Sequence, residues 1–142
     1  MTATRKDGHA TGMAAEFFVM SQLFRLKHAP ALTLGNAKSI DILVRSESGK
    51  HYDVSVKAVR GGGKWGVSSE DESNAQNRIY VFLLYKNFED ITTSPIAYVI
   101  PATEVEPMKS GWHQGWALYY SSKANRPKNL EDYREAWDRY FK

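Results

Sequence analysis

The run IYVFLLY, residues 79–85, places the strongest constraint on the fold of this chain. Seven apolar residues follow one another without polar alternation, which is typical of a strand buried on both faces of a sheet. Such a strand lies in the centre of its sheet and needs packed elements on either side. A second strand is predicted shortly after it, at PIAYVI, residues 95–100.

One helix and three strands are predicted before this central strand. Apolar residues recur at helical spacing over residues 11–27 and predict a largely buried stripe, made of Met13, Phe17, Met20, Leu23 and Phe24. Strands are predicted at 31–34, 39–45 and 51–59. The segment SESGK, with Gly49 in the turn, joins the last two and predicts a hairpin, so these two strands should be antiparallel.

Shorter elements and loops are predicted for the rest of the chain. Residues 1–10 predict a mobile polar arm, and the glycine-rich residues 60–78 predict a loop. A short helix is expected at 101–108, an edge strand at 115–120 and an amphipathic helix at 129–141, whose apolar stripe is Leu130, Tyr133, Trp137 and Phe141. We therefore predict a single α/β domain over 1–142, with a mixed central β-sheet flanked by helices.

Composition excludes several classes of protein. The hydrophobic share of 42% and the charged share of 25% are those of an ordinary globular protein. The absence of cysteine excludes disulfides, cysteine–zinc sites and thiol nucleophiles. No apolar run approaches the ~18 residues of a membrane span, and the N-terminus lacks the apolar segment of a secretory signal. We expect a cytoplasmic protein with no membrane partner.

Charge is distributed unevenly along the chain. Residues 1–66 contain 10 basic and 5 acidic residues, whereas residues 67–142 contain 9 basic and 11 acidic ones. A positive half within a chain of net charge +3 is compatible with a polyanion as partner.

Two carboxylates stand in stretches that otherwise read as buried. Glu16 lies among the apolar residues of the first predicted helix, and Asp41 lies between Ile40 and Ile42 of a predicted strand. A carboxylate buried alone is strongly unfavourable unless it is paired, hydrogen-bonded or bound to a metal. Each residue taken singly has a structural explanation, an ion pair for Glu16 or an exposed strand end for Asp41.

A third charged residue, Lys57, follows one hairpin after Asp41 in the alternating strand DVSVKAV. Two carboxylates beside a lysine, without histidine or thiol clusters, are oxygen-rich surroundings that suit Mg²⁺ or Mn²⁺. The sequence therefore predicts that these side chains meet at one end of the sheet, and that the polar face of this strand lines a cleft.

The order of Glu16, the segment GNAKSIDILV with Asp41, and DVSVKAV with Lys57 resembles the PD-(D/E)xK nuclease superfamily. That superfamily has the restriction-endonuclease-like fold of Holliday-junction resolvases, and the resemblance covers roughly residues 11–100. It implies a DNA-binding domain that hydrolyses phosphodiesters with Mg²⁺ or Mn²⁺. It also implies that Asp41 and Glu16 hold the ion with the backbone carbonyl of Val56, and that Lys57 assists the attacking water.

The chain departs from the family pattern two residues before the lysine. The family has Asp or Glu there, and this chain has Ser55. Asp53 lies on the same strand face, about 6.6 Å further along, so either Asp53 or Ser55 is the candidate for the remaining metal ligand. The alternative function is a catalytically inactive relative that serves as a nucleic-acid-binding or protein-binding module.

Two further stretches are candidates for DNA contact. The glycine loop after Lys57 carries Arg60, Lys64 and Trp65, which we predict to contact the sugar–phosphate backbone. GWHQGWALYY places Trp112, Trp116, Tyr119 and Tyr120 near basic residues, and these aromatics either stack nucleobases or pack beneath the C-terminal helix. DNA is the expected partner, and a homodimer is considered as the assembly.

Overall fold

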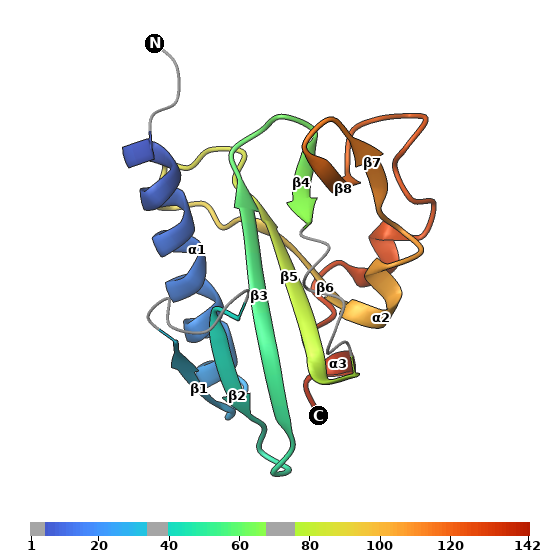
Figure 1. Cartoon of the computed structure of the whole chain (residues 1–142). Helices are drawn as coiled ribbons and strands as arrows, with labels where there is room; N and C mark the ends of the chain where they lie inside the picture. The colour runs from blue at the N-terminus through green and yellow to red at the C-terminus, as the bar shows by residue number, and fades with distance from the viewer. Residues whose placement is uncertain (1–4, 34–39, 68–75) are drawn as a thin grey trace.

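The structure is a computed structural model of the chain, and it describes residues 5–33, 40–67 and 76–142. A five-stranded mixed sheet forms its centre (Figure 1). The ends of two predicted strands, at residues 34 and 39, and most of the predicted loop, at 68–75, lie outside the described residues. The predicted fold class, a single α/β domain with a mixed central sheet, is confirmed.

The first helix, α1 (Arg5–Arg25), begins earlier than predicted, so residues 5–10 are helical rather than part of a mobile arm. Its buried side is formed by Thr11, Ala15, Val19 and Leu23, which recur every fourth residue. The predicted stripe is wrong in part: Leu23 is buried and Met20 packs against the core, whereas Phe17 and Phe24 are each 57% exposed. The smaller residues let the helix approach the sheet closely, and the phenylalanines face away from it.

The main sheet has the strand order β1-β2-β3-β5-β6. Its strands are β1 (Ala29–Leu32), β2 (Ile42–Arg45), β3 (His51–Val59), β5 (Arg78–Leu84) and β6 (Ile96–Pro101). β2 and β3 form the predicted antiparallel hairpin, and Gly49 adopts a positive φ of 94° in its turn. β3 and β5 are parallel, and β5 pairs with β6 in antiparallel fashion.

The central strand β5 confirms the prediction made from the apolar run. All of its residues are buried, from Arg78 to Leu84. Its side chains alternate between two cores, because successive residues of a strand face opposite sides. Val81 and Leu83 pack on the α1 side with Val19 and Leu23, whereas Tyr80 and Phe82 belong to the core on the other side.

A second, three-stranded sheet covers the face opposite α1 (Figure 1). It consists of β4 (Lys64–Val67), β8 (Gly115–Tyr119) and β7 (Ser110–Trp112) in that order. β4 lies within the stretch predicted to be a loop, so that prediction is wrong there. β8 was predicted to be an edge strand and is instead the middle strand of this sheet. The short helix α2 (Ala102–Val105) confirms the helix predicted at 101–108.

The C-terminal segment is not the single helix that its sequence predicts. It forms a 3-10 helix, η2 (Leu130–Tyr133), and a short α-helix, α3 (Trp137–Tyr140). Between them, Arg134 forms a β-bridge with Tyr98, and the Glu135 N–H donates to the Ala97 carbonyl at 2.8 Å. This pairing with the outer edge of β6 interrupts the helix. The predicted apolar stripe of this segment is nevertheless buried.

Candidate functional site

Asp41 lies immediately before β2 and is fixed by two hydrogen bonds to β3. Its backbone N–H donates to the Val54 carbonyl at 2.9 Å, and its Oδ2 accepts the Val56 N–H at 2.7 Å. The carboxylate therefore replaces a backbone acceptor at the end of the β2–β3 ladder. The half-buried side chain is held against β3, where its orientation is defined.

The backbone of Val56 faces the same side of β3 as Asp41. In an extended strand the N–H and the carbonyl of one residue point toward the same neighbouring strand. Since the Val56 N–H meets the Asp41 carboxylate, the Val56 carbonyl points toward that side as well. This arrangement is compatible with the predicted role of the carbonyl as a metal ligand, which stays a prediction.

Lys57 lies on β3, and Asp41 immediately precedes the neighbouring strand β2. The Asp41 carboxylate accepts the N–H of Val56, the residue before Lys57, so the backbones of the two candidates lie close together. Side chains alternate along a strand, and Val56 packs on the α1 side, so Lys57 faces the opposite side of β3. That the side chains of Asp41 and Lys57 act together stays a prediction.

The two candidates for the remaining ligand differ in exposure. The side chain of Ser55 is fully buried, whereas Asp53 is half-buried and pairs with Leu43 in the register. The predicted cleft therefore does not include an exposed Ser55 hydroxyl. Which of the two would serve as the remaining ligand stays a prediction.

Glu16 approaches this group from α1 and is half-buried. Burial raises the pKa of its carboxyl group, and the nearby negative charge of Asp41 raises it further. The two carboxylates thus lie in one electrostatic neighbourhood, although they come from a helix and a strand end. His9 counteracts the shift and lowers the same pKa.

His9 was assigned to the mobile arm, so sequence reasoning missed it. It precedes Glu16 by seven residues, and two helical turns bring such residues to the same helix face. Extending the helical period upstream of residue 11 would have placed it beside Glu16.

The donor set fits a hard divalent cation. Glu16, Asp41 and the Val56 carbonyl supply oxygen, and Mg²⁺ is commonly held by one or two carboxylates together with waters and substrate phosphates. Among the residues that the structure describes, no group of three or more histidine, aspartate or glutamate side chains could hold a metal. Any ion bound at this site would therefore take its remaining ligands from backbone, water or substrate.

The glycine loop between β3 and β4 has a specific backbone shape. Gly62 and Gly63 have φ values of 93° and 81°, and a Cβ on Gly63 would lie 2.5 Å from the Ser121 hydroxyl oxygen. Both features favour glycine over other residues. The loop thus connects the strand of Lys57 directly to the small sheet.

The three predicted DNA contacts of this loop differ in their surroundings. Trp65 is fully buried, and its indole N–H donates to the Leu83 carbonyl at 2.9 Å, so its prediction as a DNA contact is wrong. Arg60 is exposed, but its Nε donates to the Thr11 hydroxyl at 2.8 Å and its guanidinium lies 3.7 Å from the Phe88 ring centroid. The Lys64 ammonium lies 4.4 Å from the centroid of the Trp112 ring.

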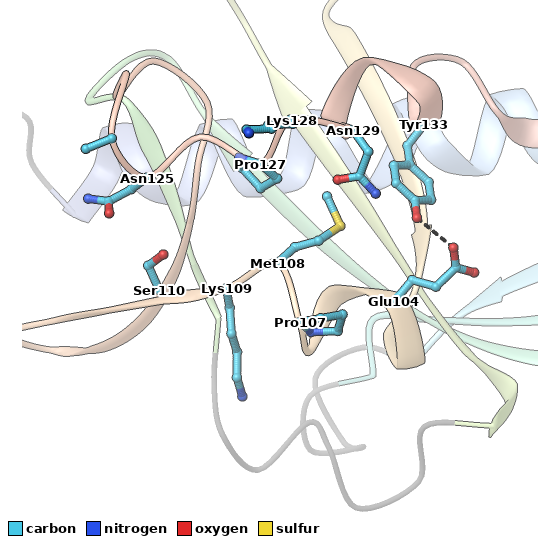
Figure 2. Close-up of a pocket in the computed structure, with 11 residues that line it drawn as sticks. Glu104, Pro107, Met108, Lys109, Ser110, Asn125, Pro127, Lys128, Asn129 and Tyr133 are labelled. Atoms are coloured by element: carbon cyan, nitrogen blue, oxygen red, sulfur yellow. Dashed lines mark hydrogen bonds between the residues drawn. The ribbon is translucent and has the colours of Figure 1, made fainter.

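A pocket of about 560 Å³ lies apart from these residues, between α2, the start of β7 and η2 (Figure 2). The Tyr133 hydroxyl donates to Glu104 at 2.6 Å within it. Burial and the Glu104 carboxylate raise the pKa of Tyr133. None of the predicted catalytic residues lines this pocket.

Comparison with known proteins finds similarity in structure and not in sequence. No protein-family model matches the sequence, and no curated protein matches it. Among solved structures, the fold is similar to that of a bacterial homing endonuclease, with a TM-score of 0.60 and 18% sequence identity. The similarity covers 92% of this chain and 90% of the endonuclease chain. A likeness at this identity shows a shared, nuclease-like fold.

No helix in the described ranges has the length and apolar character needed to span a membrane.

Proposed function

We propose that the chain is a DNA-binding, nuclease-like domain that hydrolyses phosphodiesters with Mg²⁺ or Mn²⁺. The proposal rests on the proximity of Glu16 and Asp41. The negative charge of Asp41 disfavours the charged form of Glu16 in the folded chain and raises its pKa. It occurs in a fold similar to that of a homing endonuclease. A cation is the simplest reason to keep both charges there.

The residues of the proposed site would have separate roles. Glu16, Asp41 and the Val56 carbonyl would hold the ion, which when bound polarises a phosphodiester and lowers the pKa of a water. Lys57 would place its ammonium group beside the reacting phosphate, where positive charge offsets the negative charge that develops. Asp41 is held in position beforehand by the Val56 N–H.

A second candidate function is a non-catalytic DNA-binding module. The observation that favours it is Ser55, a buried hydroxyl where the PD-(D/E)xK pattern has an acidic residue. A neutral hydroxyl is a weaker ligand for a hard cation than a carboxylate. The two candidates share DNA as the partner and differ in cleavage.

One experiment separates them. Binding of a labelled DNA duplex is measured at about 50 and about 200 mM salt. Contacts to phosphate predict a steep fall in affinity from the lower to the higher concentration. Cleavage of plasmid DNA is then followed with Mg²⁺, Mn²⁺ or EDTA. Lys57→Ala is compared with Lys50→Ala, which changes an exposed lysine in the distant β2–β3 turn.

Each outcome has a distinct meaning. Metal-dependent cleavage that Lys57→Ala removes and Lys50→Ala retains supports the nuclease. Salt-dependent binding without cleavage under any condition supports the non-catalytic module. Absence of duplex binding contradicts both candidates.

A homodimer stays a prediction, and the exposed Phe17 and Phe24 of α1 supply a surface for it. Sedimentation equilibrium of the natural protein and of Phe24→Ser tests this assembly. A monomer at every concentration would contradict it.

A further inference from the structure

The tip of the hairpin formed by β7 and β8 carries two tryptophans that the proposed catalytic group does not use. Trp116 is 42% exposed, and Trp112 is half-buried. The Trp112 indole N–H donates to the Trp116 carbonyl at 3.1 Å, which fixes the orientation of the ring. The hairpin tip thus presents two neighbouring indoles, at least partly accessible, in a fixed arrangement.

The C-terminal helical segment does not explain these rings. Trp65 packs against Tyr120, with 4.7 Å between ring centroids, so this tyrosine belongs to the core. Trp112 and Trp116 instead belong to neither buried core of the described residues. The aromatic cluster of the sequence is therefore divided between a structural part and a surface part.

The two indoles lie on opposite faces of the hairpin. Side chains alternate along each strand, and the register pairs Gly111 with Trp116 and Trp112 with Gly115. Glycine opposite each tryptophan leaves one side of each ring without a cross-strand side chain. His113, at the turn, lies 4.8 Å from the Trp112 ring and adds a third aromatic group.

A cation accompanies each tryptophan. The Lys64 ammonium lies 4.4 Å from the Trp112 ring centroid, and the Lys109 ammonium lies 4.8 Å from that of Trp116. Lys109 also pairs with Glu106 at 2.9 Å and is almost fully buried, so its role is structural. Lys64 comes from β4, and it joins the glycine loop of the proposed site to the hairpin.

The segments that form the small sheet are basic, although Glu106 pairs with Lys109 at their border. Residues 107–130 contain Lys109, Lys123, Arg126 and Lys128 and no acidic residue, and residues 54–69 contain three basic residues and no acidic one. These two segments include all three strands of the small sheet. A nucleic-acid backbone is the polyanion that complements such a surface.

The pocket of Figure 2 adjoins the base of the same hairpin, because Lys109 and Ser110 line it. Asn125 and Asn129 line it as well, so polar donors and acceptors continue from the hairpin to the pocket.

We propose that the β7–β8 hairpin tip binds unpaired bases of DNA, with Trp112 and Trp116 as stacking rings. This inference rests on the proposed function, because it takes DNA as the partner. Stacking on an aromatic ring requires an accessible base face, which single-stranded or locally opened DNA offers and an intact duplex does not. Lys64 holds the Trp112 ring and adds positive charge near the strand.

The test compares single-stranded and duplex DNA of one sequence with the full chain, by fluorescence anisotropy. Replacing both rings, Trp112→Ala with Trp116→Ala, is expected to weaken single-strand binding at least tenfold, since each stacked base contributes about fivefold or more. Duplex affinity should change less than about threefold, because contacts to phosphate do not involve the two rings. Ile91→Ala, which removes an exposed apolar side chain outside the small sheet, is the control and should change neither.

A second pair of variants guards against misfolding. Trp112→Phe with Trp116→Phe retains an aromatic ring at each position and should retain most single-strand affinity. The hairpin inference is overturned if the alanine variant loses equal affinity for both forms of DNA, or if its single-strand affinity is unchanged. In either case, duplex binding by the natural protein leaves the proposed function standing. If the natural protein binds neither form, the proposed function fails and the inference fails with it.

Discussion

Two glutamates of this molecule have opposite electrostatic environments. Glu16, on α1, has a raised pKa because burial and the Asp41 carboxylate disfavour its charge. Glu131, on η2, has a lowered pKa because the Tyr98 hydroxyl and the Arg126 guanidinium stabilise its charge. The Tyr98 hydroxyl donates at 2.8 Å and the Arg126 Nη2 at 2.9 Å.

The difference separates a structural carboxylate from a candidate functional one. Glu131 attaches the C-terminal segment to β6 and has its partners within the chain. Glu16 faces a second carboxylate, so the folded chain carries a cost that a bound cation would offset. Perturbed groups of this second kind are concentrated at functional sites.

The largest effect is expected when a third carboxylate is added beside Asp41. Ser55→Glu places a charge at a fully buried position, and an uncompensated buried charge costs about 3–5 kcal/mol. We predict a marked fall in the free energy of unfolding in EDTA and partial recovery with Mn²⁺. Chemical denaturation with and without metal measures both. Equal losses with and without Mn²⁺ would show that Ser55 does not mark a ligand position.

A smaller effect of opposite sign is expected from Glu16→Gln. Because the folded-state pKa of Glu16 lies above its unfolded value, its contribution to stability is present below the unfolded pKa and is lost as pH rises through the folded pKa. The glutamine variant should therefore be more stable than the natural protein at about pH 7. This gain in stability should shrink toward about pH 4, near the unfolded pKa of glutamate. Thermal melts across this range give the result. A variant that is less stable at neutral pH would contradict the assignment.

The smallest effect is expected from Glu131→Gln, which serves as the structural counterpart. Its folded-state pKa is lowered, so its contribution is present above the unfolded pKa and is lost as pH falls through the folded pKa. The side chain is half exposed, and solvent screening limits the loss to less than about 1 kcal/mol. Denaturation at neutral and acidic pH should show this loss only at neutral pH. Any effect of this variant on Mn²⁺ affinity would remove the distinction between the two glutamates.

The sequence predicts the main sheet well because its signals are local. The apolar run identifies β5, and the strand predicted at 51–59 has the same bounds as β3. β4 escapes prediction because its four residues, KWGV, pair with β8 about fifty positions later, and no local pattern reveals that pairing. The C-terminal helix fails for the same reason, since Arg134 and Glu135 pair with β6.

One part of the candidate site follows from a local signal. The short turn fixes the antiparallel pairing of β2 and β3, which brings Asp41 to the backbone of Val54 and Val56. The burial of Ser55 and Trp65 depends on which sheet covers them, and this follows only from the tertiary fold. α1 shows the same limit. Two apolar stripes run along it, and only packing decides which one faces the sheet.

Calorimetric titration of Mn²⁺ tests the central claim, that Glu16 and Asp41 form one cation site, most directly. The natural protein is compared with Glu16→Gln, with Asp41→Asn and with Glu131→Gln. Asparagine at position 41 keeps an acceptor for the Val56 N–H, so the change removes charge with little change in shape. We predict one site of micromolar affinity. Glu16→Gln or Asp41→Asn should weaken it at least about tenfold, or about 1.4 kcal/mol, because each carboxylate supplies a full charge to the ion. Glu131→Gln should leave the affinity unchanged. Binding that persists in both Glu16→Gln and Asp41→Asn, or no binding at millimolar Mn²⁺, would contradict the claim.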